Sequence, residues 1–171
     1  MVPFRSFAVL AFAGLLAGCA STGAVPSPFP RPGASAATPA SPPIVGAVGT
    51  SGYVVTGTAL ALRGSRYRDG GTDPSGFDCS GFVWYVFGQH GIALPRTVSD
   101  QYQAGMAVSA DRLEPGDLVF FSTIAPGASH VGIAIGGDEF VHAPSGHGEV
   151  RVERLSSSYW ASRFIGARRV I

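Results

Sequence analysis

The chain has 171 residues, of which twelve are basic and eleven are acidic, so its formal net charge at pH 7 is +1. This length is enough for one domain of ordinary size once the two ends are accounted for. The near-neutral balance excludes the strongly basic surface that nucleic-acid-binding proteins present, so no nucleic-acid partner is expected.

The first residues have the pattern of an export signal. Arg5 gives a short positive segment, and an uncharged apolar run follows from Phe7 to Ala17. That run is shorter than the about 20 apolar residues that a membrane-spanning helix needs, and it fits the hydrophobic region of a secretory signal. It ends in Leu16-Ala17-Gly18-Cys19, which resembles the lipobox of bacterial lipoproteins. The resemblance implies that residues 1–18 are a signal peptide, removed before the cysteine.

A lipid anchor and a tether are expected to follow. By the same resemblance Cys19 carries diacylglycerol on its sulfur, and two or three acyl chains hold a protein firmly on a membrane. Ala20, in place of Asp, favours the outer membrane, as in Gram-negative lipoproteins, with the protein at the periplasmic face of the envelope. Residues 19–50 are so rich in Pro, Ala and Ser that we predict a disordered tether. One compact domain is then expected over residues 51–171.

Cysteine usage draws attention to one thiol. If Cys19 carries lipid, Cys79 is left unpaired in an oxidising compartment. An odd thiol in an exported protein needs a reason, and catalysis is one such reason.

The predicted elements change type along the domain. Its first half has helical periodicity over residues 53–63, over 79–91, and from Thr97 or Ser99 to Ala104. Its second half has strand patterns over residues 117–122, 131–135, 140–142, 148–154 and 164–171. Helices followed by consecutive hairpins predict an α+β domain in which N-terminal helices pack on an antiparallel sheet.

Cys79 is expected at the start of a helix. Asp78 can cap that helix, which places the thiol in its first turn, where backbone N–H groups and the helix dipole favour an anion. Such a position lowers a thiol pKa and raises the fraction of nucleophilic thiolate. The alternative is that Cys79 is a buried cysteine acting as a small apolar side chain.

Two histidines are predicted to meet in the following hairpin. Strand alternation places His130 on the face opposite Val131 and Ile133. A three-residue loop, Gly136-Gly137-Asp138, brings His142 opposite Gly132, on the same face as His130, whereas a two-residue loop shifts the register and separates them. A base beside a thiol, oriented by a third polar group, is the general arrangement of an activated nucleophile.

Other uses of these side chains remain open. Each histidine alone is more often a surface residue or a satisfied core residue, and His90 and His147 keep that interpretation. Zinc is the rival use of Cys and His, but these side chains lack the close paired spacing of structural zinc sites. No metal or other cofactor is therefore predicted.

Several segments in chain order carry a family resemblance. They are Tyr67-Arg68-Asp69-Gly70-Gly71, Phe77-Asp78-Cys79-Ser80-Gly81-Phe82-Val83, Leu94-Pro95-Arg96-Thr97, Asp100-Gln101 with Gly105, Pro115-Gly116-Asp117-Leu118-Val119-Phe120-Phe121, Ser129-His130-Val131-Gly132-Ile133, Phe140-Val141-His142-Ala143-Pro144 and Gly166-Ala167-Arg168-Arg169. Together they cover almost all of residues 60–171 and resemble the NlpC/P60 family of papain-like cell-wall peptidases. The resemblance implies a papain-like α+β fold.

The resemblance also implies roles for single residues. It makes Cys79 the nucleophile, His130 the general base and acid, and His142 the third member of a triad. Tyr67 matches the family tyrosine that lies over the nucleophile, where it helps the Cys79 N–H to stabilise an oxyanion; the alternative is a core aromatic.

Three further residues flank the nucleophile. The resemblance implies that Asp78 and Ser80 contact the substrate, as they can in relatives. The alternative is that they cap the helix. Arg96 binds a substrate carboxylate in bidentate fashion, or it braces its own loop. Arg66 and Asp69 depart from the family pattern at the groove entrance, which leaves the substrate preference open.

The expected activity is hydrolysis of amide bonds in peptidoglycan stem or cross-link peptides through a thioester acyl-enzyme. The bond is either D-glutamyl–diaminopimelate or the diaminopimelate cross-link, and a regulatory adaptor is a possible partner. Two alternatives are a non-catalytic peptidoglycan-binding lipoprotein and related amide chemistry, as in an acyltransferase or an amidase.

Overall fold

The computed structural model describes residues 47–171, with side chains described from residue 52 onward. The predicted signal peptide, the lipid on Cys19 and nearly all of the tether lie outside the described residues. Within the described range, no helix is both long and apolar enough to cross a membrane.

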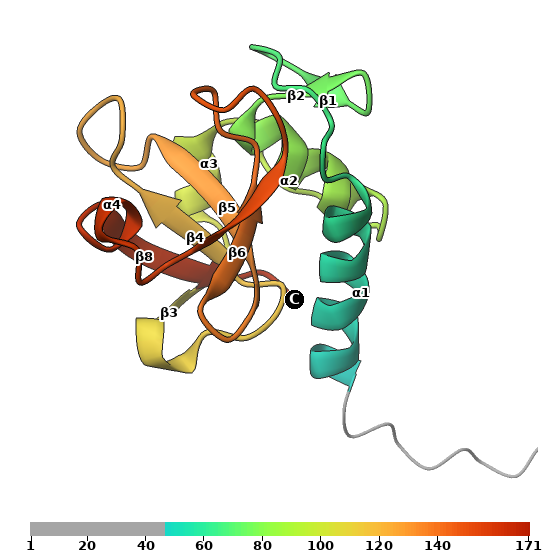
Figure 1. Ribbon diagram of the computed structural model, residues 1–171. Coiled ribbons are helices and arrows are strands. Elements are labelled where there is room, and N and C mark those ends of the chain that lie inside the picture. Colours follow the sequence, from blue (N-terminus) through green and yellow to red (C-terminus); the bar gives the residue numbers. More distant parts are fainter. Residues whose placement is uncertain (1–46) are drawn as a thin grey trace, which may run out of the picture. The chain divides into compact units, whose positions relative to one another are not determined.

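The helices lie mainly in the first half of the domain (Figure 1). They are α1 (Ala47–Ala61), α2 (Cys79–Gly88), α3 (Val98–Gln103), the 3-10 turn η1 (Ala110–Arg112) and α4 (Ser158–Ala161). The first three correspond to the predicted helices, although α2 ends at Gly88 and not at Gly91. The helix α1 begins at Ala47 and not at residue 53, so residues 47–50, which were predicted to belong to the disordered tether, are helical. The sequence analysis did not predict α4.

A six-stranded antiparallel sheet forms the centre of the domain, in the order β3-β8-β4-β5-β6-β7. Its strands are β3 (Met106–Val108), β4 (Leu118–Phe121), β5 (His130–Gly136), β6 (Glu139–His142), β7 (Arg151–Arg154) and β8 (Phe164–Arg169). A separate small hairpin joins β1 (Thr72–Asp73) to β2 (Gly76–Phe77). The pattern missed this hairpin and β3, which have only two or three residues per strand.

Apolar side chains cover both faces of the sheet. On one face, α1 and α2 pack on β4, β5 and β6 through a core that includes Phe82, Phe87 and Ile133. On the other face, Phe121 and Phe140 pack beneath Trp160 of α4. Burying each of these side chains stabilises the fold by about 1.5–3 kcal/mol. The sheet therefore holds β5 and β6 rigidly between two apolar layers.

The start of α2 is fixed by a side-chain cap and by close backbone packing. Asp78 has an extended backbone, and its Oδ1 accepts a hydrogen bond of 2.7 Å from the Gly81 N–H, as predicted. A Cβ on Gly81 would lie 2.0 Å from the carbonyl oxygen of Gly71. Only glycine fits that contact, so the first turn of α2 is pressed against the segment that precedes the β1–β2 hairpin.

The β5–β6 hairpin reaches the predicted register by a different route. The loop has two residues, Gly137 and Asp138, because Gly136 pairs with Glu139; the predicted three-residue loop is wrong. A bulge between Ala134 and Gly136 adds back the missing residue, so that Ile133 still pairs with Val141. The bulge restores the register that a two-residue loop alone would have shifted.

The restored register places the two histidine side chains on one face. A Cβ on Gly132 would lie 3.2 Å from the Cβ of His142 and 2.6 Å from the ring of Phe140. The absence of a side chain at Gly132 therefore lets His142 lie directly beside the strand that carries His130.

Candidate active site

Cys79 is the first residue of α2 and carries a free thiol. Backbone N–H groups of Ser80, Val131 and Cys79 itself donate toward the sulfur. The contact with Val131 joins the start of α2 to the start of β5, directly beside His130. The thiol of the helix and the imidazole of the strand thus share one neighbourhood.

The predicted acidity of this thiol is wrong. Burial raises the pKa of Cys79 to about 11, and the negative charge of Asp78 raises it further, while the backbone donors lower it only in part. Desolvation of the thiolate outweighs the helix terminus because the side chain lies against the core. The resting sulfur is a protonated thiol.

His130 and His142 form a buried hydrogen-bonded pair. The Nε2 atom of His130 lies 2.7 Å from Nδ1 of His142, with the two rings nearly perpendicular at 85°. Burial lowers the pKa of His130 to about 4 and that of His142 to about 2. Both rings are therefore neutral, and Nδ1 of His130 is the ring nitrogen that the bond to His142 leaves unengaged.

Trp160 holds both imidazole rings in place. Its indole stacks on His130 with centroids 5.4 Å apart and an angle of 23°, and it packs edge-on against His142 at 4.9 Å. The sequence analysis missed this residue because α4 has only four residues. The available signal was a bulky aromatic pair, Tyr159-Trp160, directly after a run of serines.

Tyr67 lies beside Cys79. Burial raises its pKa, and the neighbouring Cys79, Asp69 and Asp78 raise it further. The phenol hydroxyl therefore stays protonated at neutral pH and can donate a hydrogen bond. Its backbone is fixed by an N–H that donates to the carbonyl of Gly148, 2.6 Å away.

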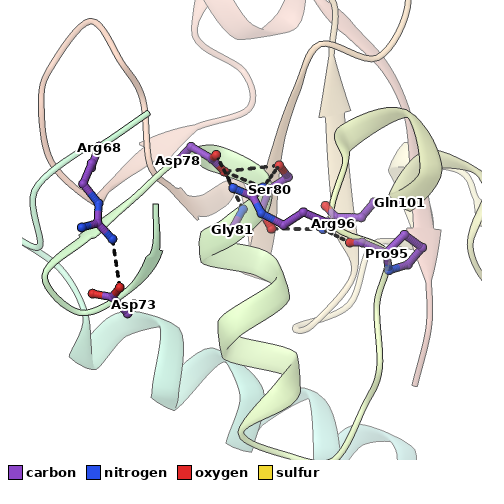
Figure 2. Close-up of polar contacts among 8 residues, drawn as sticks. All are labelled: Arg68, Asp73, Asp78, Ser80, Gly81, Pro95, Arg96 and Gln101. Atoms are coloured by element: carbon purple, nitrogen blue, oxygen red, sulfur yellow. Dashed lines mark hydrogen bonds and ion pairs between the residues drawn. The ribbon is translucent and has the colours of Figure 1, made fainter. Parts of the chain in front are cut away.

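Arg96 is bound to Asp78 and Ser80, the two residues that flank Cys79 in the chain (Figure 2). One terminal nitrogen donates to Asp78 Oδ1 at 3.0 Å and to Ser80 Oγ at 2.8 Å, and the other donates to Asp78 Oδ2. The buried amide of Gln101 donates to the Ser80 carbonyl at 3.1 Å. These contacts are the bracing that was one of the two predicted roles of Arg96, and a substrate role for the three residues stays a prediction.

A cavity of about 330 Å³ opens beside His130. Its lining includes Thr123, His147, Glu153 and Trp160. The cavity is large enough for one or two amino-acid side chains of a peptide. His130 is the member of the predicted triad that lines this cavity, and no residue of α2 does.

His90 and His147 do not join the His130–His142 pair. His90 is hydrogen-bonded to the Thr58 hydroxyl at 2.9 Å, and His147 is exposed at the cavity rim. Among residues 47–171, no three His, Cys, Asp or Glu side chains converge as a metal site would require.

The comparison with known families decides the classification. The sequence model of the NlpC/P60 family matches residues 64–169, which is more than half of the chain. This chain belongs to the NlpC/P60 family.

Its relatives within the NlpC/P60 family include bacterial cell-wall enzymes. The chain is 45% identical over 111 residues to the "Probable peptidoglycan endopeptidase LytE" of Bacillus subtilis, covering 65% of this chain and 32% of that protein. It is 44% identical over 110 residues to the "Murein DD-endopeptidase MepS/Murein LD-carboxypeptidase" of Escherichia coli, covering 64% and 57%. The chain thus matches less than two thirds of each of these curated relatives.

A solved structure of an NlpC/P60 family protein from Bacillus cereus has the same fold. It superposes with a TM-score of 0.66 at 33% identity, covering 70% of this chain and 40% of that one. The predicted α+β class, with helices on an antiparallel sheet, is confirmed.

Proposed function

We propose that this chain is a cysteine endopeptidase that hydrolyses amide bonds in peptidoglycan stem or cross-link peptides. The observation that carries the proposal is the junction of α2 and β5, where the Cys79 sulfur adjoins the strand residue next to His130, itself paired with His142 at 2.7 Å. The names of LytE and MepS support peptidoglycan as the substrate class.

The acylation step starts from a neutral thiol on Cys79 and a neutral imidazole on His130. The raised pKa of Cys79 and the lowered pKa of His130 both favour thiol and imidazole over thiolate and imidazolium. His130 therefore removes the thiol proton as the sulfur bonds to the substrate carbonyl carbon, acting as a general base. The backbone N–H of Cys79 and the Tyr67 hydroxyl donate to the oxyanion that develops.

The acyl-enzyme then forms and breaks down. His130 passes its proton to the leaving amine as the C–N bond breaks, which leaves a thioester on Cys79. Water, deprotonated by His130, attacks that thioester and releases the acid with a free thiol. His142 holds the base in position throughout.

The substitution Cys79→Ala tests the proposal. It removes only the sulfur, so release of muropeptides from purified sacculi should fall to background while thermal unfolding stays unchanged. Mass spectrometry of the released fragments identifies the bond, and it separates peptidase from amidase or acyltransferase products. Full release by the alanine variant would exclude a cysteine mechanism.

A proposal for the location in the cell rests on the sequence of the first twenty residues. We infer a lipid on Cys19 and attachment at the periplasmic face, in the outer membrane, from the sequence Leu16-Ala17-Gly18-Cys19 and Ala20. Cells fed labelled fatty acid should label the parent chain but not the Cys19→Ser variant. Equal labelling of the two chains would contradict the anchor.

A second candidate is a non-catalytic peptidoglycan-binding lipoprotein. The packing of Cys79 against the core is the observation that favours it, because burial raises the pKa of the thiol and a protonated thiol is a poor nucleophile. Co-sedimentation with sacculi in the absence of any released fragment would support this candidate over the peptidase.

A further inference from the structure

Glu153 lies behind the histidine pair, on the strand next to that of His142. It belongs to β7 and pairs with Phe140 of β6, so that it shares the His142 face of the sheet. Its side chain is largely buried, with 21% of its surface exposed. The sequence analysis gave this residue no role.

Nitrogen donors surround the Glu153 carboxylate. Trp160 donates its indole N–H to Oε2. The other oxygen, Oε1, lies 3.3 Å from Nε of Arg151, 3.8 Å from Nε2 of His147 and 3.9 Å from Nε2 of His142. Although Glu153 lines the cavity, its oxygens already face these groups, so the carboxylate acts on the protein's own side chains.

His142 Nε2 is the group that this carboxylate can influence most. The atom is buried, and among the described residues nothing accepts or donates a hydrogen bond to it. Glu153 Oε1 at 3.9 Å is beyond hydrogen-bond length, so the interaction is electrostatic. An adjacent carboxylate favours a proton on that nitrogen, because a lone pair facing a negative charge is repelled.

Two neutral imidazoles in contact have an ambiguity that an Asp–His pair lacks. Either ring can donate the proton of the 2.7 Å hydrogen bond. If His130 Nε2 donates, its Nδ1 is unprotonated and can act as a base. If His142 Nδ1 donates, His130 carries its proton on Nδ1 and cannot accept one from Cys79. Catalysis needs the first arrangement, in which the proton lies on Nε2 of His130.

We propose that Glu153 is the positioning residue that sets this proton order, by keeping the proton of His142 on Nε2 so that Nδ1 accepts from His130. Trp160 links Glu153 to the histidine pair, because its ring packs on both histidines and its N–H holds the carboxylate in place. The catalytic consequence rests on the proposed peptidase function, whereas the proton order itself does not.

The substitution Glu153→Gln tests the assignment with little change in shape. If the Gln carbonyl accepts from Trp160, its amide NH₂ faces His142 and favours a lone pair on Nε2, which reverses the order. We expect kcat on a defined muropeptide to fall about 10- to 100-fold, the range found when a group that orients a metal-bound histidine is removed, with KM unchanged. Glu153→Asp keeps the charge and should recover part of the loss.

The matched control is Glu139→Gln. Glu139 lies on β6, and alternation turns its side chain to the opposite face from Phe140 and His142. This variant should keep its kcat. Equal losses in Glu139→Gln and Glu153→Gln, or an unchanged kcat in Glu153→Gln, would overturn the proposal.

A direct readout separates this inference from the proposed function. Ring nitrogen-15 shifts of the full chain carrying Cys79→Ala report the tautomer without any turnover. We expect a protonated Nε2 on His142, and a mixed or reversed state when Glu153→Gln is added. Unchanged shifts would refute the role of Glu153; a reversed tautomer together with a parent chain that releases no muropeptides would instead refute the peptidase.

Discussion

The helix side and the sheet side of the candidate site are built by different forces. The helix side, made of Cys79 with Asp78, Ser80 and Arg96, is polar and partly exposed, and an ion pair holds it together. The sheet side, made of His130, His142 and Trp160, is buried among aromatic rings. Burial nevertheless governs the titration of both, since it raises the pKa of the thiol and lowers those of the imidazoles.

In the proposed mechanism, the sheet side therefore controls the transfer of the proton. A helix terminus that produced a stable thiolate would make the nucleophile ready before substrate arrived. Here the thiol and the imidazole both rest in neutral form, so the proton moves only as the bond to carbon forms. We therefore expect the rate of the proposed peptidase to depend on the position and protonation of His130 more than on the helix dipole.

The largest expected effect follows from removing the base. His130→Ala should lower kcat by about 10²- to 10⁴-fold, the range that a general acid–base group contributes. His142→Ala should cost only about 10- to 100-fold, because the base remains while its orientation is lost. Steady-state rates on one muropeptide measure both, and thermal unfolding checks that the variants remain folded.

The order of these two losses is the informative result. Equal losses would mean that the pair acts as one unit, as strongly coupled catalytic groups do. A larger loss for His142→Ala would contradict the assigned roles.

Local signals in the sequence predicted the parts of the site that local geometry controls. The Asp78 cap and the alternation around His130 depend on neighbours within a few residues, and the structure has both. The register of the β5–β6 hairpin came out as predicted although the loop did not, because the bulge at Ile135 compensates for the shorter turn.

Tertiary contacts explain what the sequence did not predict. The acidity of Cys79 depends on burial against a core assembled from distant segments. Arg96 and Asp78 are 18 positions apart, and Trp160 is 30 positions beyond His130. Neither periodicity nor spacing connects Glu153 to His142, because the two lie on different strands whose register the pattern did not predict.

The next largest expected effect is on the rate at which Cys79 is alkylated, which reports the protonation of its resting thiol. A shift of the Cys79 pKa from 9.0 to about 11 lowers the thiolate fraction at pH 7 by about 100-fold. Alkylation by iodoacetamide should therefore be slow at pH 7, and its rate should rise with pH up to about 11. The Cys19→Ser background leaves Cys79 as the sole thiol of the chain.

The rate of alkylation depends differently on pH if burial controls the thiol and if the helix terminus does. A thiolate stabilised by the helix terminus would react at a nearly constant rate from pH 6 to 9. A flat profile would show that the helix side dominates after all, and it would shift the mechanism to a preformed thiolate.

The smallest effect concerns the ion pair on the helix side. Arg96→Met removes three hydrogen bonds from Asp78 and Ser80 and leaves the Asp78 charge uncompensated beside Cys79. We expect the free energy of unfolding to fall by about 1–2 kcal/mol, a value discounted because the pair is partly exposed. The charge of Asp78 already raises the pKa of Cys79, so kcat should also fall, but by less than about tenfold per unit of further rise, because a more basic sulfur is also the better nucleophile.

Arg68→Met is the matched control, because Arg68 forms a 2.9 Å ion pair with Asp73 on the β1–β2 hairpin that is half exposed on both partners (Figure 2). Its loss should change stability by less than about 1 kcal/mol. Arg96→Lys keeps the charge but loses the bidentate geometry. If the lysine variant restores kcat without restoring stability, Arg96 acts on the thiol through its charge; if it restores neither, the bracing of the nucleophile turn is what matters. Matching losses in Arg96→Met and Arg68→Met would show that the helix side contributes no more than an ordinary surface ion pair.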